Sequence, residues 1–103
     1  MAGRQGGIAW TERARDGLDE AIAFIAEDSP EGARKVLEAA LKMARSLGEL
    51  SLRGRMVPEL GVESVREVFV FRYRLIYEVT ETDVIILAFL HGARDFDRWM
   101  SGR

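Results

Sequence analysis

Hydrophobic residues recur at helical spacing in two neighbouring stretches of the chain. After Thr11, which can cap a helix, apolar residues stand three and four positions apart while charged residues occupy the other side. Ser29 and Pro30 predict the start of a second helix, because serine caps free N–H groups and proline fits the first helical position. Gly48 stands where a left-handed C-terminal cap would end it. The two apolar stripes are Ala14, Leu18, Ala21, Ile22 and Ile25, then Ala33, Val36, Leu37, Ala40, Leu41, Ala44 and Leu47.

The spacing changes after Gly48. Residues 50–61 mix glycine, proline and arginine, which indicates an irregular segment in which Met56 and Val57 form a brief strand. Residues 65–71, 74–80 and 83–91 are rich in Val, Ile, Phe and Tyr, and short polar turns join them, which predicts an antiparallel meander. The last of these strands is apolar on both faces, so we expect it to be central, with helices on one face and other residues covering the second.

The order of these elements predicts an α+β fold. A short strand at residues 8–10 precedes the helices, and only a few residues separate the two helices, so they should form an antiparallel hairpin. We expect this hairpin to pack on a mainly antiparallel sheet that includes the three-stranded C-terminal meander. Residues 8–103 should form a single domain, and the glycine-rich residues 1–7 a flexible lead.

Composition excludes several kinds of chemistry. The 103 residues include no cysteine and one histidine, so disulfides, thiolate metal sites and cysteine nucleophiles are impossible, and we expect neither a metal nor another cofactor. No apolar run is long enough to cross a bilayer, and the first residues lack the apolar core of a signal peptide. We therefore expect a cytoplasmic protein that does not bind membranes.

Charge is distributed unevenly. Residues 11–50 carry six positive and nine negative side chains, whereas residues 51–103 carry eight of each, and all eight cations there are arginines. Arginine suits bidentate contacts to carboxylate or phosphate. A net charge of −2, however, argues against a protein whose affinity depends on neutralising many phosphates.

Six segments, in this order, resemble the RelE/ParE superfamily of type II toxins. That resemblance implies a small bacterial toxin, neutralised by an antitoxin that lays an extended or helical C-terminal segment across the toxin surface, so the expected assembly is a toxin–antitoxin hetero-oligomer. The segments are Trp10-Thr11-Glu12-Arg13-Ala14, Ile22 to Ile25 with Ser29 to Ala33, Gly54 to Leu60, Arg66-Glu67-Val68, Tyr73-Arg74-Leu75-Ile76-Tyr77 and His91-Gly92-Ala93-Arg94.

The superfamily divides by mechanism, and the resemblance implies different site residues for each branch. RelE-like members cleave messenger RNA in the ribosome with basic residues and usually a tyrosine or a histidine, whereas ParE-like members lack that set and poison DNA gyrase. Arg74 and Arg94 match two arginines of the nuclease branch, and Arg66 falls roughly where a strand lysine lies. The match fails elsewhere. Val68 and Val70 stand in the place of further cations, and Trp99 or Met100 stands near the place of the catalytic tyrosine.

His91 allows two interpretations. If the protein is a nuclease, His91 would carry a proton near neutral pH beside a bound phosphate, and the catalytic candidates are Arg66, Arg74, His91 and Arg94. Alternatively, His91 and Gly92 end the central strand, and Arg94 pairs with a carboxylate such as that of Asp95 or Glu67. The second interpretation is favoured, because the chain as a whole is weakly acidic.

The C-terminal tail contributes candidates for partner binding. Phe96, Trp99 and Met100 have helical spacing, but so short a helix is stable only when it packs against another surface. Trp99 and Met100 suit a protein interface, although a tail folded over the open sheet face would show the same pattern. The candidate partner-binding residues are Arg72, Arg74, Arg94, Trp99 and Met100.

The missing cations and tyrosine favour a ParE-like, non-enzymatic inhibitor of DNA gyrase held inactive by its antitoxin. The alternative is a RelE-like endoribonuclease that acts on messenger RNA in the ribosome. A third possibility is a toxin fold that no longer poisons the cell and only binds an antitoxin.

Overall fold

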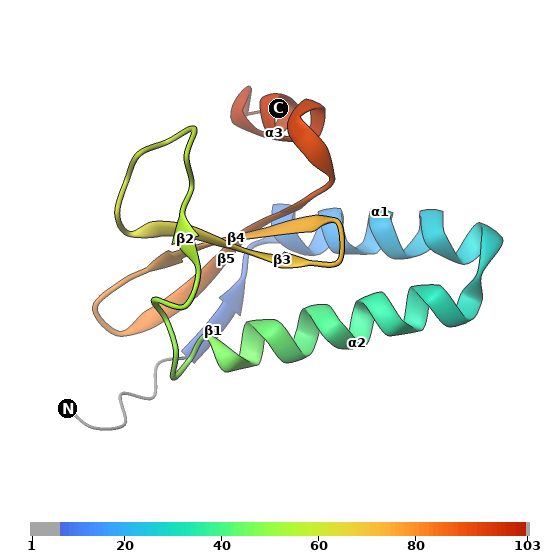
Figure 1. Cartoon of the computed structure of the whole chain (residues 1–103), viewed down its shortest axis with the longest axis horizontal. Helices are drawn as coiled ribbons and strands as arrows, with labels where there is room; N and C mark the ends of the chain where they lie inside the picture. The colour runs from blue at the N-terminus through green and yellow to red at the C-terminus, as the bar shows by residue number, and fades with distance from the viewer. Residues whose placement is uncertain (1–6, 103) are drawn as a thin grey trace.

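The chain forms one helical hairpin and one sheet, with a short third helix on the far side of that sheet (Figure 1). The computed structural model describes residues 7–102, apart from the side chain of Arg94. The predicted lead, residues 1–7, therefore lies outside the described residues, except that Gly7 begins β1. The elements are β1 (Gly7–Trp10), α1 (Glu12–Asp28), α2 (Pro30–Ser46), β2 (Arg55–Met56), β3 (Val65–Val70), β4 (Tyr73–Val79), β5 (Asp83–Leu90) and α3 (Gly92–Met100).

The five strands form one sheet in the order β1-β5-β4-β3-β2. β1 pairs in parallel with β5, and every other pair is antiparallel. The predicted α+β fold and its C-terminal meander are confirmed. The brief strand β2 comprises Arg55 and Met56, one residue earlier than predicted; the fully buried Val57 follows it and donates its N–H to the Val65 carbonyl at 3.1 Å.

Both predicted helix starts are confirmed. The Thr11 hydroxyl accepts a hydrogen bond from the Ala14 N–H at 3.0 Å, and the Ser29 hydroxyl accepts one from the Gly32 N–H at 2.9 Å. The prediction of a left-handed cap at Gly48 is wrong, since this glycine does not have a positive φ. Instead, three-residue turns continue the chain past α2, with the Gly48 N–H bonded to the carbonyl of Arg45 at 3.2 Å.

Strand β5 packs against helices on both faces, as its apolar sequence predicts; it is an interior strand between β1 and β4, and β4 is the middle strand of the sheet. A β-bulge between its Tyr77–Ile86 and Ile76–Ala88 pairs leaves Leu87 without a partner in the ladder. Before the bulge, Val84 and Ile86 face the hairpin of α1 and α2; after it, Phe89 faces the hairpin and Ala88 and Leu90 face the other side. Helix α1 lies very close to β5, since a Cβ added at Gly17 would stand 2.7 Å from the Phe89 carbonyl oxygen.

Helix α3 covers the face of the sheet opposite the hairpin. Phe96 is buried there in a second apolar cluster with Val57, Ile76, Ala88 and Leu90, and Trp99 packs at its margin. The tail thus folds over the open sheet face, which was one of the two possibilities left by the sequence. Met100 remains exposed. No helix within residues 7–102 is long and apolar enough to cross a membrane.

Candidate functional site

Arg74, the arginine of the toxin-like motif in β4, lies inside the molecule between two glutamates. Its Nη1 and Nη2 atoms donate to Oε2 and Oε1 of Glu59 at 3.0 and 2.8 Å, and its Nε donates to Oε1 of Glu67 at 2.7 Å. The Phe96 ring lies against the guanidinium, with 4.9 Å from Arg74 Cζ to the ring centroid. Carboxylates therefore bind the guanidinium N–H groups with which an arginine would bind a phosphate.

The second glutamate of this cluster is almost completely buried. Glu67, in β3, also accepts a hydrogen bond at 2.6 Å from the Nε of Arg55, so each carboxylate oxygen meets one guanidinium. Arg55 extends outward beside the Phe69 ring, with 5.4 Å from its Cζ to the ring centroid. Two arginines and two glutamates, Glu59 among them, leave this cluster with no net charge.

The ion pair between Glu59 and Arg74 shifts the pKa values of both groups. Hydrogen bonds from Arg74 hold the pKa of Glu59 below its usual value of 4.5, although partial burial opposes this effect. The bonds to Glu59 and Glu67 raise the pKa of Arg74. Both Glu59 and Arg74 therefore stay ionised at neutral pH.

The other predicted arginines do not join Arg74 in one site. Arg66 is half-buried in β3, and its Nη1 donates to the Glu63 carbonyl at 3.3 Å, while its Nε is buried without a hydrogen-bond partner among the described atoms. The side chain of Arg94 lies outside the described part of the chain. The suggested pairing of Arg94 with Asp95 or Glu67 therefore stays a prediction; the two oxygens of the Glu67 carboxylate accept hydrogen bonds from Arg55 and Arg74.

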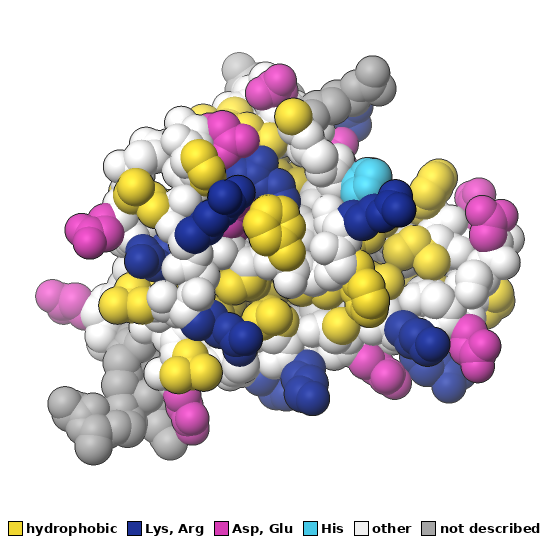
Figure 2. All heavy atoms as spheres, viewed as in Figure 1, with side chains coloured by type: hydrophobic (Ala, Val, Ile, Leu, Met, Phe, Trp, Pro, Cys, Tyr) yellow, Lys and Arg dark blue, Asp and Glu magenta, His cyan; other side chains and the backbone are white. Residues whose placement is uncertain are grey.

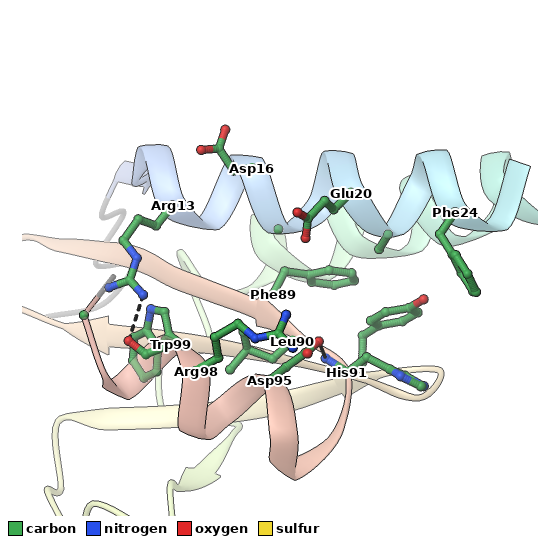
Figure 3. A pocket seen from close by; sticks show the side chains of 14 residues that line it. Arg13, Asp16, Glu20, Phe24, Phe89, Leu90, His91, Asp95, Arg98 and Trp99 are labelled. Atoms are coloured by element: carbon green, nitrogen blue, oxygen red, sulfur yellow. Dashed lines mark hydrogen bonds between the residues drawn. The ribbon is translucent and has the colours of Figure 1, made fainter.

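A cleft of about 1030 Å³ opens between α1 and α3 (Figure 3). Its floor is aromatic, since the rings of Tyr73 and Phe89 stack with centroids 4.9 Å apart and planes at 13°. On the α1 side the carboxylate of Glu20 points towards this floor, whereas that of Asp16 points away from it. Burial of the floor raises the pKa of Tyr73, so its hydroxyl stays protonated at neutral pH.

Arg13 joins the two helices at one end of the cleft. Its Nη2 donates a hydrogen bond of 2.7 Å to the carbonyl oxygen of Trp99, and its guanidinium lies 5.6 Å from the centre of the indole ring (Figure 3). Trp99, predicted to bind a partner, is thus held against α1 and against Phe96. Within the described residues no three side chains are arranged to hold a metal ion.

His91 stands at the rim of the same cleft, at the junction of β5 and α3. Its backbone N–H donates to the Asp95 carboxylate at 3.0 Å, and Gly92, with a φ of 87°, makes the sharp turn into the helix. The imidazole is exposed and lies 5.0 Å from the Tyr73 ring, where Figure 2 shows it beside a basic side chain. The interpretation of His91 and Gly92 as the end of the strand agrees with this geometry.

The cleft brings together only part of the predicted set. Its lining includes His91 and Trp99 but not Arg66, Arg72, Arg74 or Met100. Sequence reasoning missed Glu59, which binds Arg74 from an irregular segment, and Tyr73, which forms the cleft floor. The spacing of strand residues could have indicated Tyr73, since it begins β4 beside the end of β5, but no periodicity places Glu59.

Comparisons with known proteins identify one family and a shared fold. The family described as the ParE toxin of type II toxin–antitoxin systems, parDE, matches residues 8–96. The chromosomal ParDE system from P. aeruginosa contains a chain of similar structure, with a TM-score of 0.70 and 19% identity over 88% of this chain and 100% of that one. The YoeB dimer from Staphylococcus aureus shares the fold with a TM-score of 0.60 and 13% identity, over 86% of this chain and 99% of that one. No curated protein sequence matches at a significant level.

Proposed function

Because the chain belongs to the ParE toxin family of type II toxin–antitoxin systems, we propose that it stops growth by binding DNA gyrase and not by cleaving RNA. The chain is a type II toxin, and its family implies an antitoxin and a toxin–antitoxin complex. Gyrase as the target, the cytoplasm as the place of action and a non-enzymatic mechanism are the parts that we propose.

The neutralised Arg74 is the observation that carries this proposal. RNA cleavage places negative charge on a phosphate in the transition state, and removing one preorganised donor to such charge commonly costs about 10²–10³ in rate. Here the donor is already bound to Glu59 and Glu67. A phosphate would have to displace Glu59 and then lie near the buried Glu67 carboxylate.

The distribution of the remaining candidates supports the same conclusion. A nuclease needs its proton carrier beside the scissile phosphate, but His91 lines the cleft between α1 and α3, and Arg74 does not. The exposed imidazole beside Tyr73 is the one feature that favours the RelE-like alternative, because both groups can exchange protons. Arg74, the motif arginine that a nuclease would direct at the phosphate, is bound to Glu59 and Glu67 and does not line this cleft.

Gyrase supplied with relaxed plasmid and ATP tests the proposal directly. The purified toxin should reduce supercoiling in proportion to its concentration, and its cognate antitoxin should restore gyrase activity. Supercoiling that continues unchanged in a large excess of folded toxin would reject gyrase as the target. Inducing the toxin in growing cells separates the alternatives, since gyrase inhibition arrests DNA synthesis while messages stay intact, whereas a nuclease fragments messages first.

A further inference from the structure

The turn between β3 and β4 contains a residue in an unfavourable conformation. Val70 pairs with Tyr73, so Phe71 and Arg72 form a two-residue hairpin turn. Phe71 has a φ of 55°, and within residues 7–102 it is the one residue other than glycine with a positive φ. A positive φ at the first turn position is normally supplied by glycine, because a side chain there meets the backbone. A bulky aromatic residue in this position is strained.

Contacts within the toxin do not explain the choice of phenylalanine. The Phe71 side chain is 65% exposed, so it leaves most of its apolar surface in water. Strain of this kind persists mainly where function requires it. Exposed aromatic side chains on a rigid support are also the usual anchors of protein interfaces. Together these observations point to a contact with another molecule.

We propose that Phe71 is an anchor that inserts into an apolar pocket on the folded protein that this toxin poisons. Arg72, the other residue of the turn, forms no ion pair with the described residues, so its cation is available for a carboxylate at the rim of that pocket. The stiff two-residue turn keeps both side chains in place before binding, which lowers the entropy lost on association. The partner is therefore a folded protein with an apolar, acid-rimmed pocket.

The shape of the surface favours the poisoned target over the antitoxin as this partner. Phe71 is a convex feature at the tip of a hairpin, and a convex anchor needs a preformed pocket. The antitoxin segment expected from the family lies extended or helical across the toxin and offers no pocket of its own, so the concave cleft between α1 and α3 suits it better. The inference rests on the part of the proposed function that gives the toxin a protein target.

Two substitutions at Phe71 distinguish the backbone strain of the turn from the contact that its ring makes with a partner. Phe71→Gly and Phe71→Asn both accept a positive φ, so each should raise Tm by a few degrees while removing the aromatic ring. Leu52→Ala is the matched control, because Leu52 is an apolar residue with the same 65% exposure and lies outside the turn. All variants are purified with the cognate antitoxin, and each is also induced alone in growing cells.

The expected result is that both Phe71 variants still form the toxin–antitoxin complex but no longer arrest growth, whereas Leu52→Ala arrests growth as the natural protein does. Undiminished growth arrest by the folded Phe71 variants would overturn the inference. Loss of antitoxin binding with growth arrest retained would also overturn the inference. So would a lower Tm in both variants, because the phenylalanine would then stabilise the fold. If the natural toxin leaves gyrase active but Phe71→Gly no longer arrests growth, gyrase is not the target, and the role of Phe71 in binding the target is still supported.

Discussion

Arg74 on β4 and Glu67 on β3 meet inside the molecule, with the arginine Nε 2.7 Å from the glutamate Oε1. A buried charge pair of this kind is stable only when every polar atom has a partner. Glu59 and Arg55 complete the set, and Glu59 comes from the irregular segment between β2 and β3. The same contacts that remove Arg74 from solvent therefore hold that segment against the sheet.

Replacement of Glu67 by glutamine should strongly destabilise the protein. Glu67→Gln leaves the Arg74 and Arg55 cations without their shared counterion, and breaking a buried pair from one side costs about 3–5 kcal/mol. Urea unfolding monitored by circular dichroism would measure the loss. Glu63→Gln, which changes an exposed glutamate of the preceding segment, should stay within about 0.5 kcal/mol of the natural protein. Equal stability of both variants would contradict the account of the cluster.

Glu59 should make stability depend on pH in the acidic range. Its pKa in the folded protein is lowered below 4.5 by Arg74, so the folded state favours the ionised form. The resulting stability is present above pH 4.5 and is lost as pH falls through the lower, folded pKa. Glu59→Gln should cost about 1 kcal/mol at pH 7, since the pair is partly exposed. The difference in free energy of unfolding between Glu59→Gln and the natural protein should shrink as the pH falls. A difference that grew on acidification would contradict the lowered pKa of Glu59.

Most of the fold could be predicted from the sequence, because helix caps and the spacing of apolar residues depend on interactions between residues close together in the chain. Caps at Thr11 and Ser29 satisfy N–H groups within the same turn, and the alternation of apolar residues marks which strands are covered. The left-handed cap predicted at Gly48 is absent because more than one kind of helix C-terminus can supply donors to the last free carbonyls. The turns after Ser46 supply them without a left-handed residue.

The candidate site was less predictable, since its contacts join distant parts of the chain. The Glu59–Arg74 pair depends on how an irregular segment folds onto the sheet, and neither spacing nor composition encodes that path. The positive φ of Phe71 was hidden for another reason. A turn between the two strands was expected. A positive φ in such a turn is normally predicted only for glycine or asparagine, and this turn has phenylalanine at that position.

Arg13 should control how firmly α3 is attached. Arg13→Ala removes the hydrogen bond to the Trp99 carbonyl and the contact with its ring, a loss of about 1 kcal/mol for a partly exposed pair. Amide hydrogen exchange should show faster exchange in α3 while the strands stay protected. Arg15→Ala changes an exposed arginine two residues further along α1 and should leave exchange in α3 unchanged. Identical exchange in both variants would show that Phe96 alone holds the helix.

His91 should be dispensable for toxicity if the strand-end interpretation holds. Its imidazole is exposed, and the hydrogen bond that starts α3 is donated by its backbone N–H, which any residue except proline can supply. His91→Ala should therefore arrest growth at the same inducer concentration as the natural toxin and leave messenger RNA intact. Removing a true general acid or base would instead lower RNA cleavage about 10²–10⁴-fold. Primer extension on abundant messages, with Leu52→Ala as a folded control, measures this. Cleavage by the natural toxin that disappears in His91→Ala would make the cleft a nuclease site and displace gyrase as the target.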